Sequence, residues 1–282
     1  MIDVAAESGW LATTIRIQQL LQMVIQAIWI DQPSTLILPH LDPCLLELLQ
    51  SSLSPDVVHL PVLQHQFVQN PTHLSSILRS QLDMDQIQDI QQVLCNLPVI
   101  DVSLSLLWKD QSALIGRNAN YKDVEWIAVP AGEECLLDVT FTRPVNPGCA
   151  PVAASTGARP KNPSAVSNQH RNAAHRNNNN AKSSAYAPRF PKPKDEGWII
   201  TLGSVDRNEL VAVKRMTLPS AVAPKSCSQQ LAFVTPHKKG RCILTFYFLS
   251  DSYVGLDQQY PVHIDVVAST RDVQPAAKDY YD

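Results

Sequence analysis

The spacing of apolar residues changes along the chain from a helical period to a strand period. Residues 9–29 carry apolar side chains at intervals of three and four, the pattern of an amphipathic helix. One face of this predicted helix holds Trp10, Ile17, Leu20, Leu21, Val24 and Ile28. The opposite face holds Arg16, Gln19, Gln22 and Gln26. Residues 1–33 are therefore expected to form the terminal helix of a helical bundle.

Two interpretations of the polar face remain open. In the first, the helix packs on a larger bundle and presents a neutral polar back to solvent. In the second, its amides and the single guanidinium of Arg16 contact the backbone of a nucleic acid, since such groups bind phosphates and sugars without reading sequence. The second interpretation rests on the absence of acidic residues from residues 11–30.

Residues 34–98 combine short helical patterns with Pro and Asn breaks, which predicts a small helix-loop-helix domain. In "PHLDPCLLELLQSSL", Asp42 is a candidate N-cap and Pro43 takes the first helical position. Two further helices are predicted in "PTHLSSILRSQ" and "DMDQIQDIQQVLCNLP". The apolar face of the last one holds Ile87, Ile90, Val93 and Leu94. The histidines of this region lack the close spacing of metal ligands, so no metal site is predicted.

From residue 99 onward the period becomes two, the pattern of half-buried strands. Seven short strands are expected, in "VIDVSLSLLW", "CLLDVTFT", "WIITL", "ELVAVKR", "QLAFV", "RCILTFYFL" and "YPVHIDVV". Short strands separated by polar turns predict an immunoglobulin-like antiparallel β-sandwich over residues 99–270. The fold class is therefore α+β and multidomain, with a helical segment followed by a β-sandwich. Residues 271–282 are expected to be a flexible tail.

Residues 146–187 interrupt the strand pattern and are rich in Pro, Asn, Ser and Ala. Such a segment cannot bury a core, which predicts a disordered insertion in the sandwich. Residues 159–194 contain eight Lys or Arg and no acid. A solvated insertion is the favoured interpretation, and contact with RNA phosphates is the alternative.

The polar corner "SDSYVGLDQQY" precedes the last strand. In the favoured interpretation Asp251 and Asp257 accept local backbone hydrogen bonds, Gly255 adopts a positive φ and Tyr253 packs across the sandwich end. In the alternative, Tyr253 and Asp257 belong to a partner-docking face, since loops at a sandwich end often carry binding.

Composition excludes several classes of protein. The net charge of -3, from 23 basic and 26 acidic residues, identifies no partner. The most apolar segment is shorter than a membrane span, and no secretory leader pattern is present, so no membrane partner is expected. The six cysteines form no CxxC pair, and several lie in apolar alternation, which favours buried reduced thiols. No phosphate loop, GxSxG or HExxH motif occurs, so no catalytic or metal residue is predicted in this chain.

Four stretches carry a family resemblance: "SGWLATTIRIQQLLQMVIQAIW", "LPVIDVS", "PRFPKPKDEGWIITLGSVDRNELVAVKR" and "GRCILTFYFLSDSYVGLDQQYPVHIDV". They resemble the C-terminal Sec-63 homology unit of large two-cassette helicases. This group includes the helicase subunit of the activating signal cointegrator complex and the spliceosomal helicase that unwinds small nuclear RNAs. The resemblance covers nearly the whole chain outside residues 146–187.

The resemblance implies a bundle end, a helix-loop-helix piece and an immunoglobulin-like β-domain, in that order. It implies that two ATPase cassettes, with their ATP and magnesium, lie outside this chain, which itself carries no cofactor. The matching helix of the family contacts the translocating single strand, which implicates Arg16, Gln19, Met23 and Gln26 in nucleic-acid binding. The implied partners are the helicase motor domains, single-stranded nucleic acid and other subunits of a cointegrator-like complex.

The chain is accordingly expected to be a non-catalytic scaffold and interaction module of an ATP-dependent RNA or DNA helicase, in the nucleus and cytosol. On this hypothesis it is a fragment or a truncated paralogue. The apolar face of its first helix then lacks part of the protein surface that would bury it. The alternative is a stand-alone protein-interaction module, of translocation type or a truncated paralogue, without a nucleic-acid function.

Overall fold

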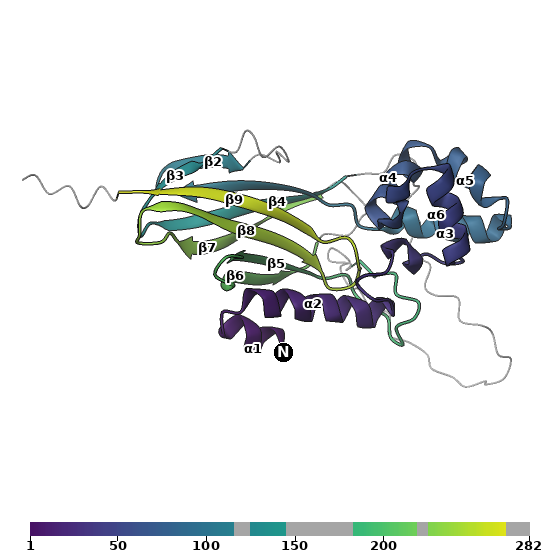
Figure 1. Cartoon of the computed structure of the whole chain (residues 1–282), viewed down its shortest axis with the longest axis horizontal. Helices are drawn as coiled ribbons and strands as arrows, with labels where there is room; N and C mark the ends of the chain where they lie inside the picture. The colour runs from purple at the N-terminus through teal and green to yellow at the C-terminus, as the bar shows by residue number, and fades with distance from the viewer. Residues whose placement is uncertain (116–124, 145–182, 219–224, 269–282) are drawn as a thin grey trace, which may run out of the picture.

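The computed structural model describes residues 1–115, 125–144, 183–218 and 225–268. Two helices come first, followed by a cluster of short helices and then by two β-sheets (Figure 1). The predicted tail and residues 146–182 of the predicted insertion lie outside the described residues. The α+β class is confirmed.

The helix predicted over residues 9–29 is α2 (Leu11–Gln26), and a short helix that was not predicted, α1 (Ile2–Glu7), precedes it. Gly9, with φ of 72°, provides the bend between them. Helix α2 ends at Ala27, which adopts the left-handed conformation with φ of 52°. The helix is therefore shorter at both ends than the predicted residues 9–29.

The helical cluster comprises η1 (Ser34–Ile37), α3 (Pro43–Ser52), η2 (Pro55–Val58), α4 (Leu60–Gln69), α5 (Pro71–Leu78) and α6 (Met84–Asn96). Asp42 caps α3 by accepting a hydrogen bond of 2.7 Å from the Leu45 amide, as its sequence pattern predicts. The predicted apolar face of α6 is buried throughout. Helix α4 was not predicted, because its glutamines and His65 interrupt the apolar pattern.

The nine strands of the described residues are β1 (Asp101–Trp108), β2 (Gln111–Ile115), β3 (Ile127–Pro130), β4 (Glu134–Arg143), β5 (Trp198–Ser204), β6 (Glu209–Met216), β7 (Lys225–Val234), β8 (Gly240–Ser250) and β9 (Gln258–Val267). They form a four-stranded sheet in the order β2-β1-β4-β7 and a five-stranded sheet in the order β3-β9-β8-β5-β6. The short strands β2 and β3 are additional to the seven predicted ones. Strand β3 pairs with β9 in parallel, so the second sheet is mixed and not purely antiparallel as predicted.

The inner faces of the two sheets enclose an apolar core. Phe141 of β4 meets Phe248 of β8 with ring centroids 4.9 Å apart, which brings one sheet against the other. Trp198 of β5 stacks on Phe248 at 4.2 Å. The inward positions predicted for the first strand, Ile100, Val102, Leu104 and Leu106, are all buried.

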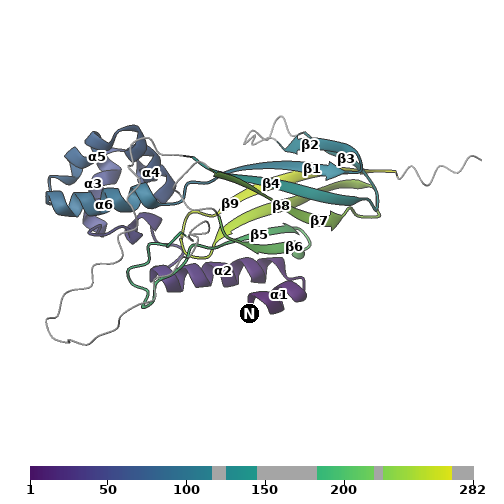
Figure 2. The same ribbon diagram turned by 180° about the vertical axis from the view of Figure 1, so that it is seen from behind.

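Helix α2 lies along the outer face of the five-stranded sheet, and Figures 1 and 2 show it beside β5 and β6 from both sides. Gly203 of β5 permits this close approach, since a Cβ there would lie 2.7 Å from Leu11 Cδ1. The segment before α2 also pairs with the start of β6, where the Leu210 amide donates to the Gly9 carbonyl at 2.8 Å. The first two helices are therefore held on the β-domain in two ways: α2 packs closely on β5, and the segment before α2 forms a backbone hydrogen bond to the start of β6.

Candidate interaction site on helix α2

Three glutamines fasten α2 to the corner between β8 and β9. The Nε2 atoms of Gln18 and Gln22 donate to the Ser250 carbonyl at 2.8 and 2.7 Å. The Nε2 atom of Gln26 donates to the Ser252 carbonyl at 2.6 Å and to the Tyr186 carbonyl at 3.0 Å. All three glutamines are buried. Because they recur every fourth residue, they project from one face of the helix, where two of them share the Ser250 carbonyl and the third reaches that of Ser252.

This arrangement reverses the predicted orientation of the helix. The face carrying Gln22 and Gln26, predicted to be the polar back, is the face that packs on the β-domain. Most of the predicted apolar face is open to solvent, with Val24 59% and Leu20 47% exposed. Hydrophobic periodicity failed here because the buried surface of the corner offers carbonyl and carboxylate oxygens, which amide donors satisfy and apolar side chains do not.

The corner itself is held by its own polar side chains. Asp257 accepts hydrogen bonds from the Ser250 amide at 2.9 Å and from Gln22 Nε2 at 2.9 Å. The Ser250 hydroxyl oxygen accepts from the Tyr253 amide at 3.0 Å. Gly255 has φ of 84°, and a Cβ there would lie 2.6 Å from the Ser34 side chain, so the corner also abuts the start of the helical cluster. The structure therefore favours the interpretation of this corner as local structure.

Both residues predicted for partner docking are engaged inside the protein. Tyr253 is buried, and its hydroxyl oxygen accepts a hydrogen bond of 2.8 Å from the Tyr186 amide. Burial raises the pKa of Tyr253 above its ordinary value, so its hydroxyl stays protonated into the alkaline range. Asp257 faces Gln22 across the helix-sheet contact. Tyr253 therefore presents no free surface in this conformation, whereas Asp257 is half-buried.

Residues 183–187, the end of the predicted insertion, contact the same corner. Ser184 forms an isolated antiparallel bridge with Asp195, and the Ala185 amide donates to the Lys194 carbonyl at 2.8 Å. The Lys194 ammonium in turn lies 2.7 Å from Asp251 Oδ2, while Asp251 Oδ1 accepts from the Gly197 amide at 2.9 Å. These contacts connect the entry into β5 with the corner that receives α2.

Burial raises the pKa of Asp257 to about 6, and its two hydrogen bonds oppose this shift only in part. The folded state therefore retains this proton at a pH where the unfolded chain, with a pKa of 3.8, has lost it. Through this group stability is greatest at acidic pH and decreases as pH rises from about 4 to 6. Relative to Asp257→Asn, the wild type should lose about 1 to 3 kcal/mol over this interval.

Urea denaturation of both proteins at pH 4.5 and pH 6.5 measures this difference. Subtracting the variant removes the contribution that the other carboxylates make to the pH dependence of both proteins. A pH-independent difference between the two proteins would contradict the raised pKa.

The four residues predicted for nucleic-acid contact do not share one surface. Arg16 is exposed, Gln19 and Met23 are half-buried, and Gln26 is fully enclosed by its bonds to the corner. Gln26 therefore cannot reach a strand while α2 is docked, which corrects its assignment to the accessible face. Arg16 Nη1 donates to Gln19 Oε1 at 3.0 Å.

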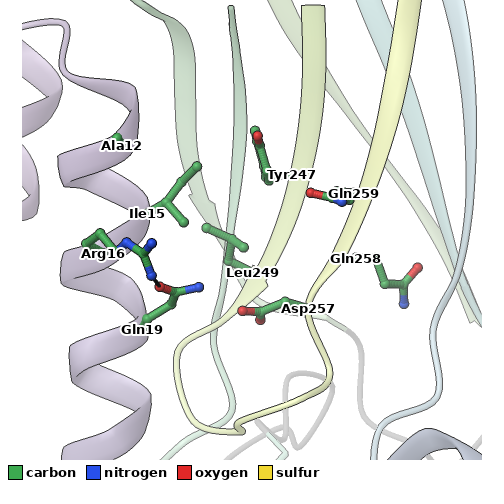
Figure 3. A pocket seen from close by; sticks show the side chains of 9 residues that line it. All are labelled: Ala12, Ile15, Arg16, Gln19, Tyr247, Leu249, Asp257, Gln258 and Gln259. Atoms are coloured by element: carbon green, nitrogen blue, oxygen red, sulfur yellow. Dashed lines mark hydrogen bonds between the residues drawn. The ribbon is translucent and has the colours of Figure 1, made fainter. Parts of the chain in front are cut away.

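Arg16 and Gln19 line one wall of a groove between α2 and the outer face of β8 and β9 (Figure 3). Tyr247 and Leu249 of β8 lie across from them, and Gln258 and Gln259 of β9 complete the lining. The one acid in the lining, Asp257, is turned toward Gln22 and Ser250 by its hydrogen bonds. The groove thus offers a guanidinium, amides and a phenol ring without a free carboxylate.

Within the described residues, no group of three or more His, Cys, Asp or Glu could hold a metal ion. Of the adjacent acids at 195–196, Glu196 is buried and binds Arg143 and the Trp198 indole N–H. The thiols of Cys135, Cys227 and Cys242 are free, and burial raises the pKa of each. Cys95 is disulfide-bonded, so the expectation of reduced thiols does not extend to it. No helix in the described ranges is both long and apolar enough to cross a membrane.

A helix held by three glutamine amides on a two-sheet domain, with an apolar stripe open to solvent, is the arrangement that this chain presents. The chain belongs to the family of the Sec63 Brl domain, whose family model matches residues 1–263. This confirms the family resemblance of the four sequence stretches.

The curated relatives are much longer proteins. Activating signal cointegrator 1 complex subunit 3 of Bos taurus is 32% identical over 293 residues, covering 97% of this chain and 12% of that protein. The Mus musculus protein of the same name is 33% identical over 294 residues, with 96% and 12% covered. DExH-box ATP-dependent RNA helicase DExH14 of Arabidopsis thaliana is 27% identical over 263 residues, with 93% and 9% covered. The chain thus corresponds to a helicase-associated module that spans about an eighth of its first relatives.

Sequence reasoning missed Gln18 and Ser250, two residues that hold the helix in place. The signal was present in the spacing of Gln18, Gln22 and Gln26, which recur at intervals of four. A row of amides on a helix with a single charged residue fits a buried polar contact and a nucleic-acid contact equally well.

Proposed function

We propose that the chain is a non-catalytic scaffold and interaction module of an ATP-dependent RNA or DNA helicase. The observation that carries this proposal is the exposed apolar stripe of α2, formed by Trp10, Leu20, Leu21 and Val24. The opposite face of the helix is fixed to the β-domain, so rotation cannot bury the stripe. Contiguous exposed apolar surface of this kind typically marks a protein interface.

The proposed occupant of the stripe is the helicase motor and the helical bundle attached to it, in the same polypeptide or in a partner chain. ATP and magnesium act in the motor cassettes, and this module binds neither. The relatives named as helicases and as a cointegrator complex subunit support this assignment. Other subunits of a cointegrator-like complex are proposed as further partners, and the nucleus and cytosol as the location.

The β-domain is proposed to be of the immunoglobulin-like type. Its strand order β9-β8-β5-β6 matches the order of the G, F, C and C′ strands of variable-type immunoglobulin domains. The other sheet places β1, β4 and β7 side by side, as the A, B and E strands lie in that fold. No disulfide joins the two sheets within the described residues, where Cys135, Cys227 and Cys242 are free.

Single-stranded nucleic acid is the proposed ligand of the groove beside α2. In the groove, Arg16 supplies the positive charge and Gln19 an amide, and Met23, four residues further along α2 and outside the groove lining, supplies an apolar contact for a base. These groups suit backbone and stacking contacts that do not depend on sequence. Gln26 is left out of this proposal because its side chain is enclosed.

Motor docking is tested with the double variant Leu20→Glu/Val24→Glu and the helicase region of the bovine relative, from which the matched segment has been deleted. We expect isothermal titration calorimetry to show binding by the wild-type chain and at least a tenfold weaker affinity for the variant, since two buried carboxylates must be desolvated. The control Ser76→Glu/Gln92→Glu adds the same charge at exposed positions of α5 and α6. No binding by the wild-type chain would instead indicate the stand-alone interaction module.

A further inference from the structure

A second cationic surface lies on the β-domain, at the end remote from the helices α3–α6 (Figure 1). It consists of Lys238 and Lys239 in the turn between β7 and β8, Arg241 at the start of β8, His263 of β9 and Trp126 just before β3. We call these five residues the distal surface. None of them was singled out by the sequence analysis.

The register of the sheet brings the last three of these residues together. Ile243 lies opposite His263 and Ile127 lies opposite Ile264, so Arg241, His263 and Trp126 project from the same outer face. The Arg241 guanidinium carbon is 4.7 Å from the centroid of the Trp126 ring. The His263 ring meets the edge of the same indole at 5.1 Å, with an angle of 73° between planes. Stacking against Trp126 holds the guanidinium in place without neutralising it.

The three cations of this surface differ from several others in the described residues because they form no ion pair. Elsewhere in the described residues, Lys109, Arg143, Lys194, Arg207 and Arg215 each form an ion pair. Lys238, Lys239 and Arg241 are exposed and form no ion pair within the described part of the chain. Asp265 lies opposite Arg241 in the register and on the same outer face. Burial lowers the pKa of His263, so at neutral pH it contributes a ring and no charge.

We propose that the distal surface binds single-stranded nucleic acid, with Lys238, Lys239 and Arg241 on phosphates and the Trp126 ring against a base. Unpaired cations beside an aromatic ring form the combination that binds single strands without sequence preference. An acidic peptide would use the same cations but gains little from the indole face, which favours the nucleic acid. This inference rests on the proposed function in that the ligand is the same single strand.

The distal surface and the groove beside α2 share one face of the sheet. The outward positions of β8 run from Arg241 through Ile243 and Thr245 to Tyr247, which lines the groove. Six residues of extended chain separate the two ends, or about 20 Å. A single strand that follows β8 would therefore contact Arg16 at one end and Arg241 at the other.

The test is fluorescence anisotropy of the full 282-residue chain with a fluorescein-labelled oligouridine of about 20 nucleotides, a length that covers both contacts. We expect Lys238→Ala/Lys239→Ala to raise the Kd about tenfold and to reduce the salt dependence of binding by about 1.4 in logarithmic slope. The control Arg79→Ala/Lys214→Ala removes the same charge from other exposed sites and should change the Kd less than twofold.

Trp126→Ala should raise the Kd about tenfold through lost stacking, and Trp126→Phe should recover most of the affinity. Circular dichroism melts confirm that each variant is folded. Equal Kd values for the lysine variant and its control would overturn the proposal. So would a lysine variant that loses binding to polyglutamate while keeping full affinity for oligouridine, which would assign the surface to an acidic protein.

The variant Arg16→Ala/Gln19→Ala separates this inference from the proposed function. If it alone weakens binding, the groove holds the strand and the distal surface does not. If only the distal variants weaken binding, the distal site stands and the proposed contact along α2 fails.

Discussion

Glu196→Ala should destabilise the protein by about 3 to 5 kcal/mol, because it leaves the guanidinium of Arg143 buried without its counterion. Arg143 and Glu196 are 8% and 4% exposed, and they form an ion pair at the edge of the core. Glu196 also accepts a hydrogen bond of 2.9 Å from the Trp198 indole, so the substitution removes a second buried contact. Urea denaturation monitored by Trp fluorescence measures the change in the free energy of unfolding.

The matched control is Glu209→Ala, which removes a glutamate from a solvent-exposed pair with Arg207. Exposed pairs of this kind contribute about 0 to 1 kcal/mol, so the control should stay close to the wild type. The double variant Arg143→Met/Glu196→Leu should recover much of the lost stability, since it removes both charges together. Equal effects of Glu196→Ala and Glu209→Ala would contradict the importance of the buried pair.

Gln22→Ala should loosen the contact between α2 and the β-domain at a cost of about 2 to 4 kcal/mol. Its Nε2 atom is the donor that the Ser250 carbonyl and the Asp257 carboxylate share, and both acceptors lie inside the helix-sheet contact. Leaving a buried carboxylate without this donor is the larger part of the penalty. Limited trypsin digestion should cut at Arg16 faster in the variant, because an undocked α2 becomes accessible.

Gln19→Ala serves as the control on the same helix, with the same change of residue. Gln19 is half-buried and its recorded partner is Arg16, so its loss should alter stability by less than about 0.5 kcal/mol. If both alanine variants unfold at the same urea concentration, the hydrogen bonds of Gln22 contribute nothing to stability. Another contact would then hold the helix on the β-domain.

The β-domain was predicted from the sequence more accurately than helix α2, which packs on its outer face. Strand positions such as Leu137, Val139 and Phe141 alternate strictly, and each is buried as that alternation requires. Strands β2 and β3 were missed because they are only five and four residues long and carry little apolar alternation. The cap of α3 at Asp42 was predictable because capping depends on neighbouring residues alone.

The accessibility of the candidate site residues was predicted only in part, and their contact with nucleic acid stays a prediction. Arg16 and Gln19 lie on an accessible groove as the polar pattern indicated, whereas Gln26 is buried. The difference arises from long-range contacts: the acceptors of Gln26 are the carbonyls of Tyr186 and Ser252, which no local pattern connects to the helix. Helical periodicity separates polar from apolar faces, but it does not determine which of them another part of the chain will cover.

The hydrogen bonds of Gln18, Gln22 and Gln26 also affect how the protein folds during translation. Gln18 and its acceptor Ser250 are 232 positions apart in the chain, and the helix is made first. Helix α2 cannot dock until the corner at residues 250–257 has left the ribosome, so its glutamine face stays uncovered until then. A nascent segment with exposed Leu20, Leu21 and Val24 is prone to aggregate. The order of translation therefore makes this helix a natural client for a ribosome-bound chaperone.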